Sequence, residues 1–309
     1  MTHKVPNTYN VAFAGICGSD LQKTSRTSRL RELQMLGHEI VVRDDKGYAV
    51  INPMISCKTC KSCLEHGDMF CENLEAIGRA SGGAFSGTIT APETNLVNIS
   101  YAEPKLGVLV DPLGVVLHGM EKLDNPQDIL IIGDGTIAQL SLLYLCLPGS
   151  SLNSCTLIAK SPERAKSLRA QYSKILKEQV DKIFILESVA DGSTYDAVIE
   201  CVGRGQSETI NLAISHVATK GTILSFGIYP IGFKADLDIR PLLYKEATII
   251  GSNSYNHADF INATTIIGEY ESAYASLLGD TYSDITKAFQ AARSKKVPEK
   301  IIVSFKKSL

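Results

Sequence analysis

Four cysteines within fifteen residues constrain this chain more than any other feature of its sequence. They are spaced Cys57-x2-Cys60-x2-Cys63-x7-Cys71, so one loop can present several thiolates to a single tetrahedral ion, with Zn–S bonds of about 2.3 Å. Four sulfurs leave no open coordination position, which predicts a structural zinc site. The alternative is a cluster of free cysteines in a reduced loop. A nucleic-acid zinc ribbon would use two CxxC pairs with a longer spacer, and the charged neighbours here are of mixed sign.

Length and charge narrow the class of protein. At 309 residues the chain is longer than one hydrophobic core usually supports, so two domains are expected. A net charge of −2 without long runs of one sign argues against nucleic acid or an acidic membrane as the main partner. No apolar run approaches the ~18 residues of a membrane span, and the N-terminus does not resemble a secretion signal. A cytoplasmic protein is expected, in which eight cysteines remain reduced.

The secondary-structure pattern expected from the sequence changes near residue 128. The first ~115 residues are irregular and β-rich, with many glycine and proline turn signals. Strands and helices then alternate, which predicts a parallel sheet covered by helices on both faces. After Gly251 the pattern is helical, and a final strand is expected over Lys300–Phe305. The expected strands of the alternating region are 128–132, 156–159, 182–186, 195–200 and 221–226, and its expected helices are 136–147, 162–177 and 208–217.

A second possible zinc site is dispersed along the first domain. It consists of Cys17 in GICGSD, His38 and Glu39 in GHE, and Asp111 in VDPL. Taken singly, such residues are more often core residues than ligands. Together they supply one thiolate, one imidazole and one or two carboxylates, which can hold zinc and leave a position open for water or substrate.

A glycine loop follows the strand expected at 128–132. Gly133-Asp-Gly135-Thr136-Ile137-Ala138 comes after an apolar strand and opens a helix, the context that a dinucleotide fingerprint requires. Gly133 permits the tight turn, and Gly135 lets the backbone approach a pyrophosphate at the helix N-terminus. The alternative is a glycine turn without a ligand.

In this order, the motifs resemble the zinc-dependent medium-chain dehydrogenase/reductase family, which includes alcohol, polyol and sugar dehydrogenases. The resemblance implies an α/β protein with a GroES-like, β-rich catalytic domain (1–117 and 253–309) and a Rossmann cofactor domain (118–252). It assigns Cys17, His38 and Asp111 as catalytic zinc ligands, with Glu39 able to approach the metal. Ser19 would bond the substrate oxygen and begin the proton relay.

The reaction implied is hydride transfer between a secondary alcohol, polyol or sugar-type substrate, or the matching ketone, and NAD(P). At the end of the second strand, Ala159 replaces the acid that NAD-specific members carry. Nearby Lys160, Ser161 and Arg164 favour NADP, unless they are only solvated residues at a helix start, which leaves NAD open. By resemblance Cys201, Val202, Gly203, Phe226 and Gly227 flank the nicotinamide end. A homodimer or homotetramer is the family expectation, with 246–252 continuing the sheet across a dimer contact.

Three departures from the family pattern matter. The segment before Cys17 and the segment from His38 to Pro53 are both shorter than in most family members, which suggests a smaller catalytic domain. Gln22 stands where many members carry a proton-relaying histidine. Two rival interpretations remain: a reductase of carbonyls or alkenes whose zinc is only structural, and a non-catalytic dinucleotide sensor of the same fold.

Overall fold

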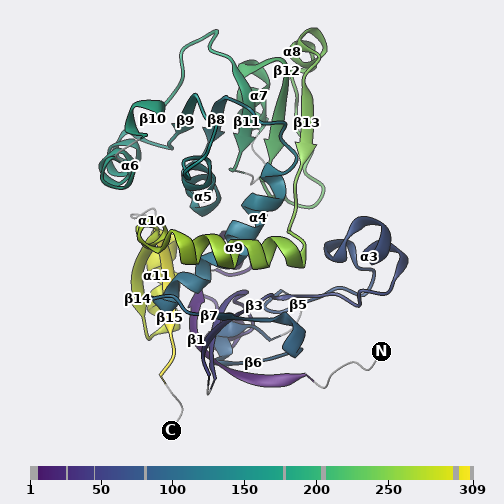
Figure 1. Cartoon of the computed structure of the whole chain (residues 1–309), viewed down its shortest axis with the longest axis vertical. Coiled ribbons are helices and arrows are strands. Elements are labelled where there is room, and N and C mark those ends of the chain that lie inside the picture. Colours follow the sequence, from purple (N-terminus) through teal and green to yellow (C-terminus); the bar gives the residue numbers. More distant parts are fainter. Residues whose placement is uncertain are drawn as a thin grey trace. The chain divides into compact units, whose positions relative to one another are not determined.

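The chain forms two compact units. The computed structural model describes residues 6–25, 27–44, 46–79, 82–176, 179–202, 207–294 and 299–306. The first unit comprises residues 1–114 and 254–309, and the second comprises 115–253. The chain therefore leaves the first unit along α4 (Val110–Met120), builds the second, and returns to the first (Figure 1). The sequence analysis expected domains of 1–117 with 253–309 and of 118–252, and these two units have nearly the same bounds.

A seven-stranded sheet organises the first unit. Its order is β14-β15-β1-β2-β3-β7, and β6 pairs with β1. β1 pairs antiparallel with both β2 and β15, which places Gly15 opposite Glu39. Alternate apolar side chains of these strands pack with Phe85 and Phe289 into one core. The strands are β1 (Asn7–Gly15), β2 (Glu39–Asp44), β3 (Gly47–Ile51), β6 (Thr88–Ala91), β7 (Leu96–Ile99), β14 (Leu278–Tyr282) and β15 (Lys300–Ser304).

The four-cysteine segment is a separate excursion from this sheet. It lies between β4 (Met54–Ile55) and β5 (Glu75–Ala76), which pair with each other and close its base. Helices of the first unit connect the strands and cover the core. They are α1 (Gly18–Gln22), α2 (Leu30–Gln34), α3 (Lys61–His66), α9 (His257–Glu269), α10 (Glu271–Ala275) and α11 (Ile285–Ser294), with 3-10 turns at 68–70, 84–86, 93–95 and 104–109.

The second unit is a parallel six-stranded sheet in the order β10-β9-β8-β11-β12-β13. In chain order this is 3-2-1-4-5-6, the arrangement of doubly wound dinucleotide-binding domains, in which ligands bind at the carboxyl ends of the strands. The fold class predicted from the sequence is therefore confirmed. The elements are β8 (Asp128–Ile132), α5 (Thr136–Leu145), β9 (Ser154–Ile158), α6 (Pro162–Ile175), β10 (Ile183–Leu186), β11 (Tyr195–Glu200), α7 (Ser207–His216), β12 (Val217–Ser225), α8 (Ile239–Lys245) and β13 (Thr248–Gly251), with a 3-10 turn at 180–182.

The structure corrects two details of the predicted elements. The stretch after Gly251 contains a strand, β14, which pairs in parallel with the last strand and has no apolar alternation to reveal it. β12 begins at Val217, which the pattern assigned to the preceding helix. Within the described residues, no helix is both long and apolar enough to cross a membrane.

Candidate functional site

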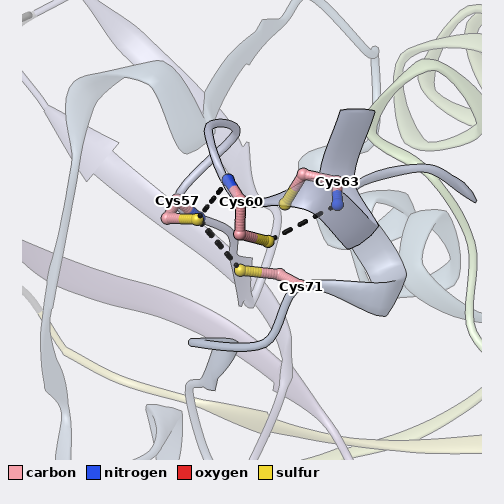
Figure 2. A group of neighbouring side chains, drawn as sticks. All are labelled: Cys57, Cys60, Cys63 and Cys71. Atoms are coloured by element: carbon pink, nitrogen blue, oxygen red, sulfur yellow. Dashed lines mark hydrogen bonds between the residues drawn. The ribbon is translucent and has the colours of Figure 1, made fainter. Parts of the chain in front are cut away.

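The four cysteines of the excursion converge on one point. Their sulfur atoms all lie within 4.8 Å of one another, and the Sγ atoms of Cys57 and Cys71 are 3.5 Å apart (Figure 2). Tetrahedral Zn–S bonds of ~2.3 Å would place sulfurs about 3.8 Å apart, so little movement is needed to bind zinc. Backbone N–H groups already donate to these sulfurs: Cys57 N to Cys71 Sγ at 3.2 Å and Cys60 N to Cys57 Sγ at 3.4 Å.

The charge state of this group also fits a cation. Hydrogen bonds from the backbone of Thr59 and Cys60 lower the pKa of Cys57 to about 5, which favours the thiolate that binds zinc. Desolvation and the neighbouring Cys60 sulfur raise the pKa of Cys63 to about 12. A bound dication is what would let all four sulfurs ionise together. The four-sulfur set fits a closed, structural zinc site.

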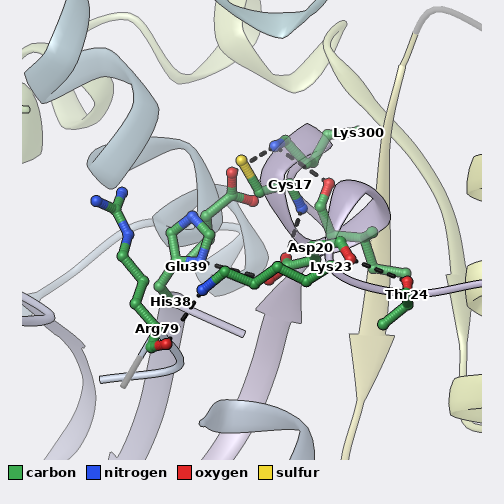
Figure 3. Close-up of polar contacts among 9 residues, drawn as sticks. Cys17, Asp20, Lys23, Thr24, His38, Glu39, Arg79 and Lys300 are labelled. Carbon is green, nitrogen blue, oxygen red and sulfur yellow. Dashed lines mark hydrogen bonds and ion pairs between the residues drawn. The ribbon is translucent and has the colours of Figure 1, made fainter. Parts of the chain in front are cut away.

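A second group of ligand atoms lies in the first unit, where β1, β2 and β15 meet. Cys17 follows β1 and precedes α1, and His38 and Glu39 lie at the start of β2. One ligand atom from each of these three residues lies within 4.8 Å of the other two. Figure 3 shows Cys17, His38 and Glu39 with the side chains that contact them. The strand pairing of β1 with β2 joins residues that lie more than twenty positions apart.

A carboxylate that the sequence analysis did not single out lies beside His38. The Nδ1 of His38 lies 3.5 Å from the Asp20 Oδ1, and both side chains are 1% exposed. The other Asp20 oxygen accepts the Cys17 backbone N–H at 2.9 Å. Burial alone lowers the pKa of His38, but the Cys17 charge and the contact with Asp20 outweigh it and raise the pKa well above its ordinary value. The surroundings of the imidazole are therefore strongly negative and attract a cation.

Glu39 is fully buried and is held on one side only. Its Oε1 accepts from the Lys300 Nζ at 2.6 Å, while its Oε2 is buried with no hydrogen-bond partner in the described part of the chain. Burial raises the pKa of Glu39, and the charges of Lys300 and His38 offset this in part. A Cβ on Gly15 would lie 2.0 Å from the same Oε2. The carboxylate therefore fits only because residue 15 is glycine.

The burial and the atom types of the second group fit a bound zinc ion. Both imidazole nitrogens of His38 and the Oε2 of Glu39 are buried polar atoms without a hydrogen-bond partner among the described residues, and Cys17 belongs to the same group of converging ligand atoms. Unsatisfied buried polar atoms are rare because each costs free energy. One sulfur, one nitrogen and one oxygen form a three-ligand zinc set with a fourth position left over.

Asp111 and Ser19 lie near this group but outside it. Asp111, in α4, is buried and accepts a hydrogen bond from the Tyr255 hydroxyl. It is not among the three residues whose ligand atoms converge, although its charge acts on His38 and Glu39. Ser19 lies in α1, half-buried, two residues after Cys17. The predicted third ligand is thus held by Tyr255, and Glu39 has the free ligand atom.

In the second unit, the glycine loop occupies the carboxyl end of β8. Gly133 adopts a φ of 120°, a conformation that favours glycine. Gly135 precedes α5, and a Cβ there would meet nothing within 4 Å. The N-terminus of α5, with Thr136 and Ile137, faces the end of this loop. An open approach to a helix N-terminus fits the pyrophosphate of a dinucleotide.

The remaining predicted cofactor residues lie at the same edge of the sheet. Lys160 and Ser161 follow β9 (Ser154–Ile158), and Arg164 is in the first turn of α6. Cys201 and Val202 follow β11, and Cys201 N donates to Ile132 O at 3.0 Å. Phe226 and Gly227 follow β12, and the buried Phe226 ring packs against Gly119. Gly203 lies outside the described residues.

Three residues with evident roles were missed by the sequence analysis: Asp20, Lys300 and Tyr255. Asp20 had a local signal, since it lies three residues after Cys17, where an acid can accept the backbone N–H at a helix start. Lys300 and Tyr255 had none. They lie at least 140 positions from Glu39 and Asp111 respectively, and only the fold brings them together.

Comparison with known proteins finds similarity over both units of the chain. A model of the alcohol dehydrogenase GroES-like domain matches residues 9–101, and a model of zinc-binding dehydrogenases matches residues 156–269. A sorbitol dehydrogenase of Halalkalibacterium halodurans is 22% identical over 303 residues, covering 92% of this chain and 87% of the relative. Galactitol 1-phosphate 5-dehydrogenase of Escherichia coli is 26% identical over 271 residues, covering 78% of this chain and 74% of the relative.

A solved structure of similar fold is L-idonate 5-dehydrogenase from Escherichia coli, with a TM-score of 0.79 at 20% identity, covering 99% of this chain and 92% of that one. One family model matches only residues of the first unit, and the other matches mainly the parallel-sheet unit and continues to residue 269 of the first. This chain belongs to the zinc-dependent medium-chain dehydrogenase/reductase family.

Proposed function

We propose that this protein is a zinc-dependent alcohol dehydrogenase that passes a hydride between a polyol or sugar-type secondary alcohol, or the matching ketone, and NAD(P). The observation that carries the proposal is the convergence of one ligand atom each from Cys17, His38 and Glu39, with buried atoms of His38 and Glu39 that have no hydrogen-bond partner among the described residues. Such a three-ligand set keeps a position for substrate. Bound zinc lowers the pKa of an alcohol and polarises a carbonyl, and the dinucleotide carries the hydride.

The surrounding residues prepare the ligands for this role. Asp20 lies 3.5 Å from Nδ1 of His38 and would orient the ring electrostatically, so that Nε2 is the nitrogen available to a metal. Lys300 binds one oxygen of Glu39, which leaves the other oxygen, without a hydrogen-bond partner among the described residues, available to a metal. Tyr255 donates to Asp111 and so keeps that carboxylate beside the ligands as an outer charge. Asp111 would become a further ligand only if the two side chains separated.

The proton from the substrate needs a route of its own. Ser19 is the hydroxyl closest in sequence to Cys17, and we assign it the first step, accepting the substrate proton. Gln22 is exposed and carries no titratable group, so residue 22 would not relay the proton beyond Ser19.

The division of labour follows the two units. The first unit, with both cysteine-containing groups, would bind metal and substrate, and the second would bind the dinucleotide. NADP or NAD is the proposed cofactor, since Lys160, Ser161 and Arg164 do lie at the carboxyl end of β9. A polyol or sugar substrate is supported by the relatives, which are named for sorbitol and galactitol 1-phosphate.

We also propose that the protein is a homo-oligomer. β13 is an edge strand of the parallel sheet, and Ile249 on it is exposed, as are Leu243 and Tyr244 on the adjoining α8. An open edge with apolar neighbours is suited to pairing with a second copy. None of the eight cysteines forms a disulfide, which is consistent with a reducing compartment such as the cytoplasm.

Elemental analysis of zinc tests the proposal. The wild type should contain two zinc ions per chain, and Cys17→Ser should contain one and lose NAD(P)-linked oxidation of sorbitol and related polyols. Cys146→Ser, which changes a buried thiol of the second unit, is the control and should keep both. If the wild type contains one zinc and Cys17→Ser keeps it, the result supports instead the reductase whose zinc is only structural. If the wild type binds two zincs and the cofactor but turns over neither alcohols nor ketones, the result supports the non-catalytic dinucleotide sensor.

A further inference from the structure

The acidic residue between the two loop glycines makes contacts that bear on the choice of cofactor. Asp134 Oδ2 accepts the Lys160 backbone N–H at 3.1 Å and the Arg164 Nε–H at 3.0 Å. A second nitrogen of Arg164 donates to the Asp134 carbonyl oxygen at 3.1 Å. The two side chains are 14% and 18% exposed, so water screens this pair only in part. Arg164 is therefore already bound by a carboxylate.

The position of this carboxylate is informative. In doubly wound domains, the 2′-hydroxyl of the adenosine ribose is bound by an acid at the end of the second strand, and a 2′-phosphate by an arginine nearby. The second strand here is β9, followed by Ala159, which has no acid to offer. Asp134 bonds the N–H of the next residue, Lys160. A carboxylate from the glycine loop thus lies where β9 itself supplies none.

The hydroxyl expected to hold a phosphate is also engaged. Ser161 Oγ accepts the Arg164 backbone N–H at 3.4 Å, capping α6. It also contacts Glu163, whose own backbone N–H and the Ser161 hydroxyl lower the pKa of the Glu163 carboxyl. Two carboxylates therefore surround the place where a phosphate of about −1.5 to −2 charge would bind.

We propose that Asp134 selects NAD(H) over NADP(H), by accepting the ribose 2′-hydroxyl and by keeping Arg164 from a 2′-phosphate. The inference deepens the proposed dinucleotide-dependent function and rests on it. It revises the sequence-based preference for NADP, which treated Lys160, Ser161 and Arg164 as available to a phosphate.

Dissociation constants for NADH and NADPH, followed by nicotinamide fluorescence on the zinc-loaded protein, test this. The wild type should bind NADH at least about tenfold more tightly, as expected for one hydrogen bond to a charged group. Asp134→Asn should weaken NADH and tighten NADPH by about tenfold each, because the freed Arg164 can bind the phosphate. Adding Arg164→Ala should abolish the gain for NADPH. Asp181→Asn, an exposed carboxylate of the same unit, is the matched control and should change neither constant.

Each other outcome is decisive. A wild type that binds NADPH as tightly as NADH overturns the role of Asp134, and so does an unchanged ratio in Asp134→Asn. A protein that binds neither cofactor contradicts the dinucleotide-dependent function itself, which separates the two failures. Because binding is measured directly, the result does not depend on knowing the substrate.

Discussion

The two cysteine-containing groups of the first unit differ in how they are built. The closed group takes four sulfurs from one fifteen-residue stretch, on a loop tied at its base by β4 and β5. The other takes Cys17 from just after β1 and His38 and Glu39 from the start of β2, and Lys300 of β15 binds Glu39. The first can form wherever its loop can close, but the second exists only when the sheet has formed. A local group therefore stabilises structure, while a dispersed group depends on structure and is suited to chemistry.

Replacing one ligand in each group should separate these roles most clearly. Cys60→Ser removes a ligand of the closed group, and because metal binding there is coupled to folding, Tm should fall by about 10 °C. Its turnover at low temperature should change little. Cys17→Ser should lose turnover while Tm changes by only a few degrees. Thermal melts and initial rates on both variants provide the measurement, and equal loss of Tm in both would break the distinction.

The dispersed group can also be disturbed without touching a ligand. Gly15→Ala places a Cβ 2.0 Å from Glu39 Oε2, so the carboxylate must leave the position it has beside Cys17 and His38. Such overpacking costs about 1–3 kcal/mol, or roughly a hundredfold in zinc affinity at its upper end. Gly18→Ala, where a Cβ would meet nothing within 4 Å, is the matched control. Zinc titration of the two variants should show a loss only in the first, and the closed group should stay loaded in both.

A smaller effect is expected from the carboxylate behind His38. Asp20→Asn keeps an oxygen for the Cys17 backbone N–H but removes the charge that orients the imidazole. Loss of such outer partners typically lowers metal affinity or activity by about 10–100-fold. Zinc affinity and kcat/KM should fall together in Asp20→Asn. A lower kcat/KM with unchanged zinc affinity would mean that Asp20 acts on the substrate and not through His38.

The same contrast explains what the sequence could predict. The closed group was visible in full because its spacing alone defines it, and the glycine loop of β8 was visible because a strand and a helix flank it. The dispersed ligands could be proposed only as a set. Sequence order suggested Asp111 as a ligand, but it could not reveal that Tyr255 binds Asp111 or that Lys300 leaves one oxygen of Glu39 free. Those contacts join residues far apart in the chain, and Asp134 was overlooked because its partner Arg164 lies thirty positions away.

The smallest expected effect concerns the contact between the four-cysteine excursion and α9. His257 Nδ1 lies 3.0 Å from the Asn52 side-chain nitrogen, and its backbone N–H donates to Asp68. Burial, and then the charge of Lys58, lower the pKa of His257. Because the folded pKa is depressed, the unfolded chain binds the proton first, so stability is lost as pH falls below about 6.5. The slope cannot exceed about 1.4 kcal/mol per pH unit, which is the value for one proton.

Denaturant unfolding of the wild type and His257→Gln between pH 5 and 8 isolates this term, since protonation of the cysteine thiolates contributes equally to both. The wild type should lose more stability than His257→Gln as pH falls, and turnover at permissive temperature should not follow the difference. Parallel slopes in the two proteins would show that His257 binds protons equally in the folded and the unfolded state, which contradicts the prediction. A difference that appeared in turnover would instead couple the excursion to the dispersed group, and the separation between a structural and a chemical site would no longer hold.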